Sequence, residues 1–134
     1  MTFNTIKEYN DLKDEIATWK IFIEIMEDEY FTIKSELNRI IGKKKINEDI
    51  LKVLELLQTT ILENEKRLFQ YKKSLLNHYE KLNKKPEKDN LSNPTILNNH
   101  HLLHEDEEHI KQNLVELKKS FSDFINLMNG RKLV

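Results

Sequence analysis

The sequence predicts an all-α fold, an antiparallel up-down-up three-helix bundle with long, coiled-coil-like helices. One observation is that apolar residues recur at alternating intervals of three and four over three separate stretches, as in a heptad seam. Another is that the 134 residues include only 2 glycines and 2 prolines, too few for the turns of a sandwich, a barrel or a βαβ array. The length suits one domain, so we expect a single helical-bundle domain over residues 1–134.

The first helix is predicted over residues 5–41. Its apolar seam is unbroken, and Gly42 follows it in the position where a glycine commonly ends a helix. A seam of this length indicates coiled-coil packing against neighbouring helices. The seam consists of Tyr9, Leu12, Ile16, Trp19, Ile23, Met26, Tyr30, Ile33, Leu37 and Ile40.

The second helix is predicted over residues 47–83. Asn47 can cap its first turn, and acidic residues follow where the helix dipole favours them. A flanking row of Leu62, Phe69 and Leu76 is expected to widen the buried face, as in a helix that touches two neighbours. The seam consists of Ile50, Leu54, Leu57, Ile61, Asn64, Leu68, Tyr71, Leu75, His78 and Leu82.

The third helix is predicted over residues 94–129, with a polar, flexible linker over about 84–92 before it. Pro94 suits a first helical position, and Gly130 ends the seam. Short connections between long helices favour antiparallel neighbours, which gives the up-down-up order. Seams of this kind are similar to those of spectrin-like and other three-helix coiled coils, a likeness of architecture that implies no function. The seam consists of Ile96, His100, Leu103, Glu107, Ile110, Leu114, Leu117, Phe121, Phe124 and Met128.

A few seam positions are polar, and antiparallel pairing places some of them at one level. Counting from the turns puts His78 level with Tyr9 and His100, and Glu107 level with Tyr71, whose hydroxyl could donate to it. If His78 and His100 share a layer, they would repel once both are protonated at about pH 6, so a response to pH is an alternative role. The interpretation we favour is a hydrogen-bonded polar core layer that fixes register, made of Tyr9, Asn64, Tyr71, His78, His100 and Glu107.

The His- and Glu-rich segment 100–109 offers a different interpretation, a metal site. Histidines and carboxylates at i,i+4 spacing aim two ligands at one ion, as in helical-bundle metal centres. A site of His78, His100, His104 and Glu108, with Glu107 in place of Glu108 as a variant, would bind Zn²⁺ or iron. Against it, the sequence lacks the Glu-x-x-His pairs in register on two helices that di-iron bundles use.

The first helix carries more apolar residues than one seam needs. Ile21 and Ile25 fall on its expected solvent face, one turn apart, and Phe31 flanks the seam on the other side. An apolar patch of this kind could bind a protein partner or close a homodimer. The alternative is a broad core face that curls round the helix.

Composition excludes several classes of function. A net charge of −1 gives no strong attraction to nucleic acid or an anionic membrane, and no stretch approaches the ~18 apolar residues of a membrane span. The first residues lack a signal-peptide layout, so we expect a cytoplasmic protein. The sequence has no cysteine and no glycine-rich phosphate loop. We expect a small non-enzymatic protein of interaction or assembly without a cofactor; the alternative is a zinc- or iron-binding helical bundle.

Overall fold

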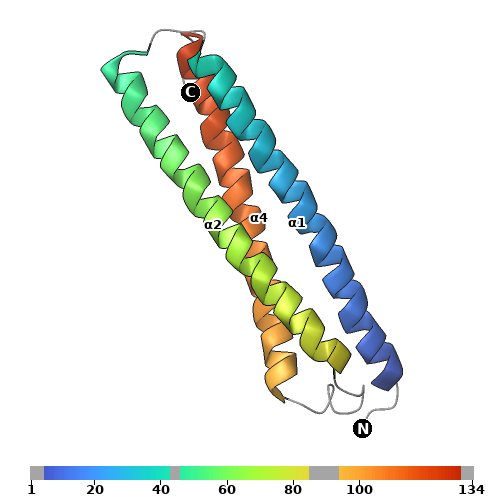
Figure 1. Cartoon of the computed structure of the whole chain (residues 1–134). Helices are drawn as coiled ribbons and strands as arrows, with labels where there is room; N and C mark the ends of the chain where they lie inside the picture. Colours follow the sequence, from blue (N-terminus) through green and yellow to red (C-terminus); the bar gives the residue numbers. More distant parts are fainter. Residues whose placement is uncertain (1–4, 43–45, 85–93, 131–134) are drawn as a thin grey trace. The chain divides into compact units, whose positions relative to one another are not determined.

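The chain folds as an antiparallel up-down-up three-helix bundle, which confirms the predicted fold class (Figure 1). The computed structural model describes residues 5–42, 46–84 and 94–130. These hold α1 (Thr5–Ile41), α2 (Glu48–Lys84) and α4 (Pro94–Met128), and within those ranges no strand is present. The predicted linker lies outside the described residues, apart from Lys84.

The observed helix ends agree with the sequence signals to within one residue. The side chain of Asn47 caps α2, because its Oδ1 accepts a hydrogen bond from the Ile50 amide at 2.8 Å. Pro94 is the first residue of α4. After α4, Gly130 has a φ of 73°, a left-handed conformation that glycine adopts without strain.

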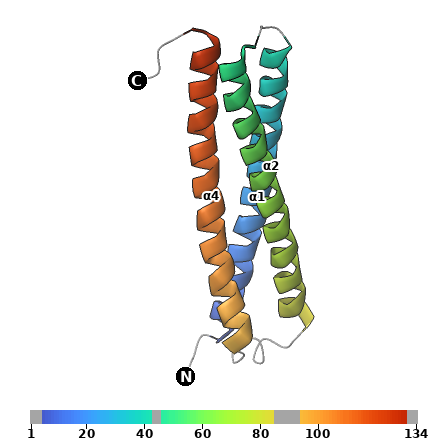
Figure 2. The ribbon, with the colours of Figure 1, turned by 90° about the vertical axis from the view of Figure 1, so that its left-hand side faces the viewer.

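The packed helices form two compact units, each containing part of every helix. Unit 1 comprises Met1–Glu24 and Leu68–His109, and unit 2 comprises Ile25–Arg67 and Ile110–Val134. Figure 2 shows the three helices side by side from a second direction. The single domain expected from the sequence stays a prediction, and each unit is described below by itself.

The buried apolar side chains of both units all belong to the three predicted seams. In unit 1 they are Ile16, Trp19, Ile23, Leu68, Tyr71, Leu75, Leu82, Ile96 and Leu103. In unit 2 they are Met26, Tyr30, Ile33, Leu37, Ile40, Leu54, Leu57, Ile61, Ile110, Leu114, Leu117 and Phe124. The 3-4 spacing therefore predicted the core well.

The flanking row on α2 does not widen the core, and this expectation is wrong. Leu62, Phe69 and Leu76 are all exposed. The physical reason is that seam residues alone fill the space between closely packed helices, so residues beside the seam stay at the solvent edge of the contact. The row is thus an exposed apolar feature.

Candidate functional site

The polar seam residues of unit 1 are buried in its core. His78 on α2 is 3% exposed, His100 on α4 is 7% exposed, and Glu107 on α4 is equally buried. Buried imidazoles and carboxylates cost free energy unless they find partners. Their partners therefore decide what this part of the core can do.

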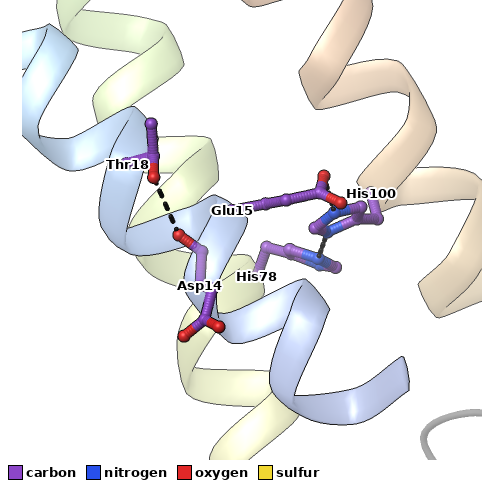
Figure 3. Close-up of polar contacts among 5 residues, drawn as sticks. All are labelled: Asp14, Glu15, Thr18, His78 and His100. Atoms are coloured by element: carbon purple, nitrogen blue, oxygen red, sulfur yellow. Dashed lines mark hydrogen bonds and ion pairs between the residues drawn. The ribbon is translucent and has the colours of Figure 1, made fainter. Parts of the chain in front are cut away.

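A chain of hydrogen bonds joins all three helices in unit 1 (Figure 3). Nε2 of His78 lies 3.0 Å from Nδ1 of His100, and Nε2 of His100 lies 3.0 Å from Oε2 of Glu15 on α1. An ionised carboxylate can only accept, so Nε2 of His100 donates to Glu15. With both rings neutral, Nδ1 of His100 must then accept, and Nε2 of His78 is the donor.

Trp19 covers this chain on the α1 side. Its ring centroid lies 4.8 Å from that of His100 at an interplanar angle of 33°, and 6.0 Å from that of His104. Trp19 is itself buried and is the chain's only tryptophan. The His100 ring is therefore held between His78, the Glu15 carboxylate and an indole face, and its orientation is fixed.

His78 stays neutral near pH 7. Burial lowers its pKa to about 4, and positive charge on His100 and on Lys81 acts in the same direction. Its second ring nitrogen, Nδ1, is buried and has no hydrogen-bond partner among the described residues. The ring therefore depends on its bond to His100 for polar contact.

A hollow of about 260 Å³ in unit 1 opens beside His78. The α2 side of it includes Ser74 and Lys81, and the α4 side includes Asn99 and Asp106. These polar side chains can form hydrogen bonds with water in the hollow. The hollow borders the His78 residue, whose Nδ1 atom itself is closed to solvent.

Tyr71 and Glu107 lie close together, but the hydrogen bond expected between them is not formed. The Tyr71 hydroxyl is buried with no hydrogen-bond partner in the described part of the chain. Burial raises the pKa of Tyr71 above its ordinary 10.0, and the negative charges of Glu107 and Asp106 raise it further. The sequence placed Tyr71 and Glu107 at one level along the helices, but it did not give the orientation of their side chains.

The other members of the predicted polar layer lie elsewhere. Asn64 is half-buried in unit 2, near the buried Tyr30. Burial raises the pKa of Tyr30 to about 12, and the Asn64 side chain partly opposes this. The side chain of Tyr9 lies outside what the structure describes. What the structure brings together in unit 1 is the His78–His100 pair, with Glu15 added.

The four predicted metal ligands are not assembled. The described residues contain no group of three or more His, Cys, Asp or Glu side chains placed to hold a metal ion. Both ring nitrogens of His100 are already bonded, one to His78 and the other to Glu15. His104 lies against Trp19 and is exposed, as is Glu108.

The predicted contact residues on α1 are on the surface. Ile21, in unit 1, is 57% exposed; Ile25 and Phe31, in unit 2, are 47% and 69% exposed. Ile23, between the two isoleucines, is buried. These exposures exclude the alternative of a core face that curls round the helix.

An exposed leucine of α2 lies near the same ion pair as Phe31, and the sequence did not reveal this. Nζ of Lys34 on α1 lies 2.8 Å from Oε2 of Glu65 on α2, which joins the two helices within unit 2. Phe31 precedes Lys34 by one turn, and Leu62, 66% exposed, precedes Glu65 by one turn. Because the helices are antiparallel, Phe31 and Leu62 lie beyond opposite ends of this ion pair along the helix axes. We call these four residues the Phe31–Leu62 face.

A hollow of about 270 Å³ adjoins this face at its Leu62 end. Lys34 and Leu62 line it, together with the buried side chains of Leu37 and Ile61 and the polar Asn38 and Gln58. The floor is therefore apolar and the rim polar. The signal for Leu62 in the sequence was its place outside the 3-4 seam, which indicates the edge of a contact rather than its centre.

Comparisons with known proteins add no assignment. The sequence matches no family model, and it has no match among curated proteins or solved structures. No helix among the described residues has the length and apolar character to cross a membrane. Three-helix bundles serve many unrelated functions, so function is inferred from the side chains themselves.

Proposed function

We propose that this chain is a non-enzymatic protein-binding module that works in assembly, with its exposed apolar side chains as contacts. The observation that carries the proposal is Phe31, a large aromatic side chain that is 69% exposed on a helix whose seam is filled. Exposed apolar side chains that lie next to one another are typical of protein contact sites. Ile21 and Ile25 on α1 support it as further exposed apolar side chains.

The Phe31–Leu62 face has the make-up of a contact site. The aromatic Phe31 lies at one end of the Lys34–Glu65 ion pair, and Leu62 with its apolar-floored hollow lies at the other end. Interfaces commonly draw their strongest contacts from a few aromatic and apolar side chains, with polar groups around them. Both signs of charge are present, which suits a protein surface better than a polyanion.

A second copy of the chain is the partner that this geometry favours. The projecting Phe31 and the hollow floored by Leu37 and Ile61 lie on one face. In a two-fold dimer each surface meets itself, so the Phe31 ring of one copy can enter the hollow of the other. Two copies can therefore bury both Phe31 rings and occupy both hollows without any further segment.

Light scattering on a sizing column tests self-association directly. We expect twice the chain mass of 16.1 kDa for the wild type and the single mass for Phe31→Glu. Glu63→Gln, at an exposed position of α2 in the same unit, is the matched control and should stay dimeric. A wild-type protein that remains monomeric over a range of concentrations would refute self-association.

A photo-crosslinking residue at position 31 then tests protein binding in general. Placed there in the cells of origin, it should give a discrete adduct that is absent when it stands at position 63. Leu62→Glu should remove the adduct, because Leu62 shares the face. If position 31 gives no adduct beyond the control and the wild type is monomeric, the proposed function is wrong.

A further inference from the structure

We propose that the Glu15–His100–His78 chain makes unit 1 acid-sensitive, so that acidification loosens the packing of α1, α2 and α4 within unit 1 and leaves unit 2 folded. This inference is independent of the protein-binding function. It rests on how many protons two hydrogen-bonded imidazoles can hold inside a core.

The contact between the two rings accommodates one proton. Nε2 of His78 and Nδ1 of His100 are 3.0 Å apart, which is a hydrogen-bond distance with a single hydrogen between the nitrogens. If both rings are fully protonated, two N–H groups point at each other and the bond is lost. Because both rings are buried, neither can turn to water without opening the core.

The charged groups around the pair tolerate a first proton and oppose a second. From α1, the Glu15 carboxylate accepts from His100 and compensates one positive charge. From α2, Lys81 adds a positive charge near His78, and a protonated His100 on α4 does the same. Asp106 on α4 borders the hollow beside His78. Glu15 already pairs with His100 and Asp106 is exposed, so neither compensates a charge on His78 within the core, and opening the unit relieves the second positive charge.

The histidines are confined to one unit. All 5 lie within Leu68–His109, which belongs to unit 1, and unit 2 has none. The buried ionisable side chain of unit 2, Tyr30, has a raised pKa and does not titrate in acid. Acid is thus expected to act on the packing of unit 1.

Hydrogen exchange measured by mass spectrometry resolves the two units within one helix. An open state in which His78 has its ordinary pKa of 6.5, against about 4 in the closed state, gains about 30-fold in population between about pH 7.5 and about pH 5. After correction for the intrinsic effect of pH, protection of 94–109 should fall by about this factor. Protection of 110–128, in unit 2, should not. Equal changes in the two segments would overturn the proposal.

Two variants separate the buried pair from histidine content in general. His78→Gln keeps a side-chain N–H near the position of Nε2 but cannot be protonated, so protection of 94–109 should lose most of its dependence on pH. His101→Gln removes an exposed histidine that pairs with Glu105 of its own helix, so it should respond like the wild type. A wild-type response in His78→Gln would contradict the proposal.

Ring ¹⁵N spectra of the wild-type protein keep the proposal testable if His78→Gln fails to fold. At neutral pH both buried histidines should show the Nε2–H tautomer, and His78 should be protonated only at a pH well below the ordinary imidazole pKa of 6.5. The fluorescence of Trp19 should change together with protonation of the neighbouring His100. Five rings that all titrate in the ordinary range would refute the inference.

Discussion

Acidification should lower the free energy of unfolding by about 3 kcal/mol between pH 6.5 and pH 4. The pKa of His78 is about 4 in the folded chain, against an ordinary 6.5 in the unfolded chain. Between these values the unfolded state binds the proton and the folded state does not. The part of the unfolding free energy that depends on a neutral His78 is therefore fully present above pH 6.5. It is lost as the pH falls and changes no further below pH 4. The gap of about 2.5 units, at about 1.4 kcal/mol per unit, sets an upper limit of about 3.5 kcal/mol, most of which is lost between pH 6.5 and pH 4.

Urea unfolding followed by circular dichroism, in steps from about pH 7.5 to about pH 4.5, measures this loss. Against a typical total stability of about 5–15 kcal/mol, it is a large fraction. His78→Gln should remove most of the decline, and His101→Gln should leave it in place. Glu107→Gln checks the buried carboxyl group of unit 1. If the decline is as steep in His78→Gln as in the wild type, the buried pair is not its source and the reasoning fails.

Three further predictions concern burial. Tyr71→Phe should raise the free energy of unfolding by about 1 kcal/mol, because it removes a buried hydroxyl without a partner among the described residues; thermal melting measures this. Ile23→Glu should cost more than about 4 kcal/mol in urea unfolding, whereas Ile21→Glu, two residues away and exposed, should cost about 1 or less. Leu75→Ala should lower the free energy of unfolding by about 2–5 kcal/mol in the same assay. Leu76→Ala, at the exposed next position, should lower it by less than about 1 kcal/mol, and equal losses would contradict the burial pattern.

Most of the fold could be predicted because the heptad spacing and the helix ends carry strong local signals. The capping side chain of Asn47 and the glycine at position 130 each act within a few residues, and both are found where expected. The exposure of Leu62 could not be predicted in this way. It depends on how closely the neighbouring helices approach, which residues along one helix do not encode.

The candidate site could be predicted only in part. Counting from the turns brought His78 and His100 to one level, because antiparallel packing makes level a matter of arithmetic. Glu15 was missed, since it lies one residue outside the seam and looks like an ordinary solvated carboxylate. Its role depends on the tilt of its side chain across to α4, where His100 supplies a donor. The hydrogen bond expected between Tyr71 and Glu107 is absent for the same reason, because level alone does not determine how two side chains are oriented.

The histidine chain has an energetic consequence that apolar seam residues would not have. Two leucines at positions 78 and 100 would extend the apolar core, and replacing buried polar pairs in this way is often neutral or stabilising. Such a core would hold no proton and would have no reason to respond to pH. The bonded imidazoles therefore make unit 1 less stable than an apolar core would, and they make its stability depend on protonation. The Glu15 carboxylate compensates the charge of the first proton. Unit 2, which contains no histidine, provides the comparison within the same three helices.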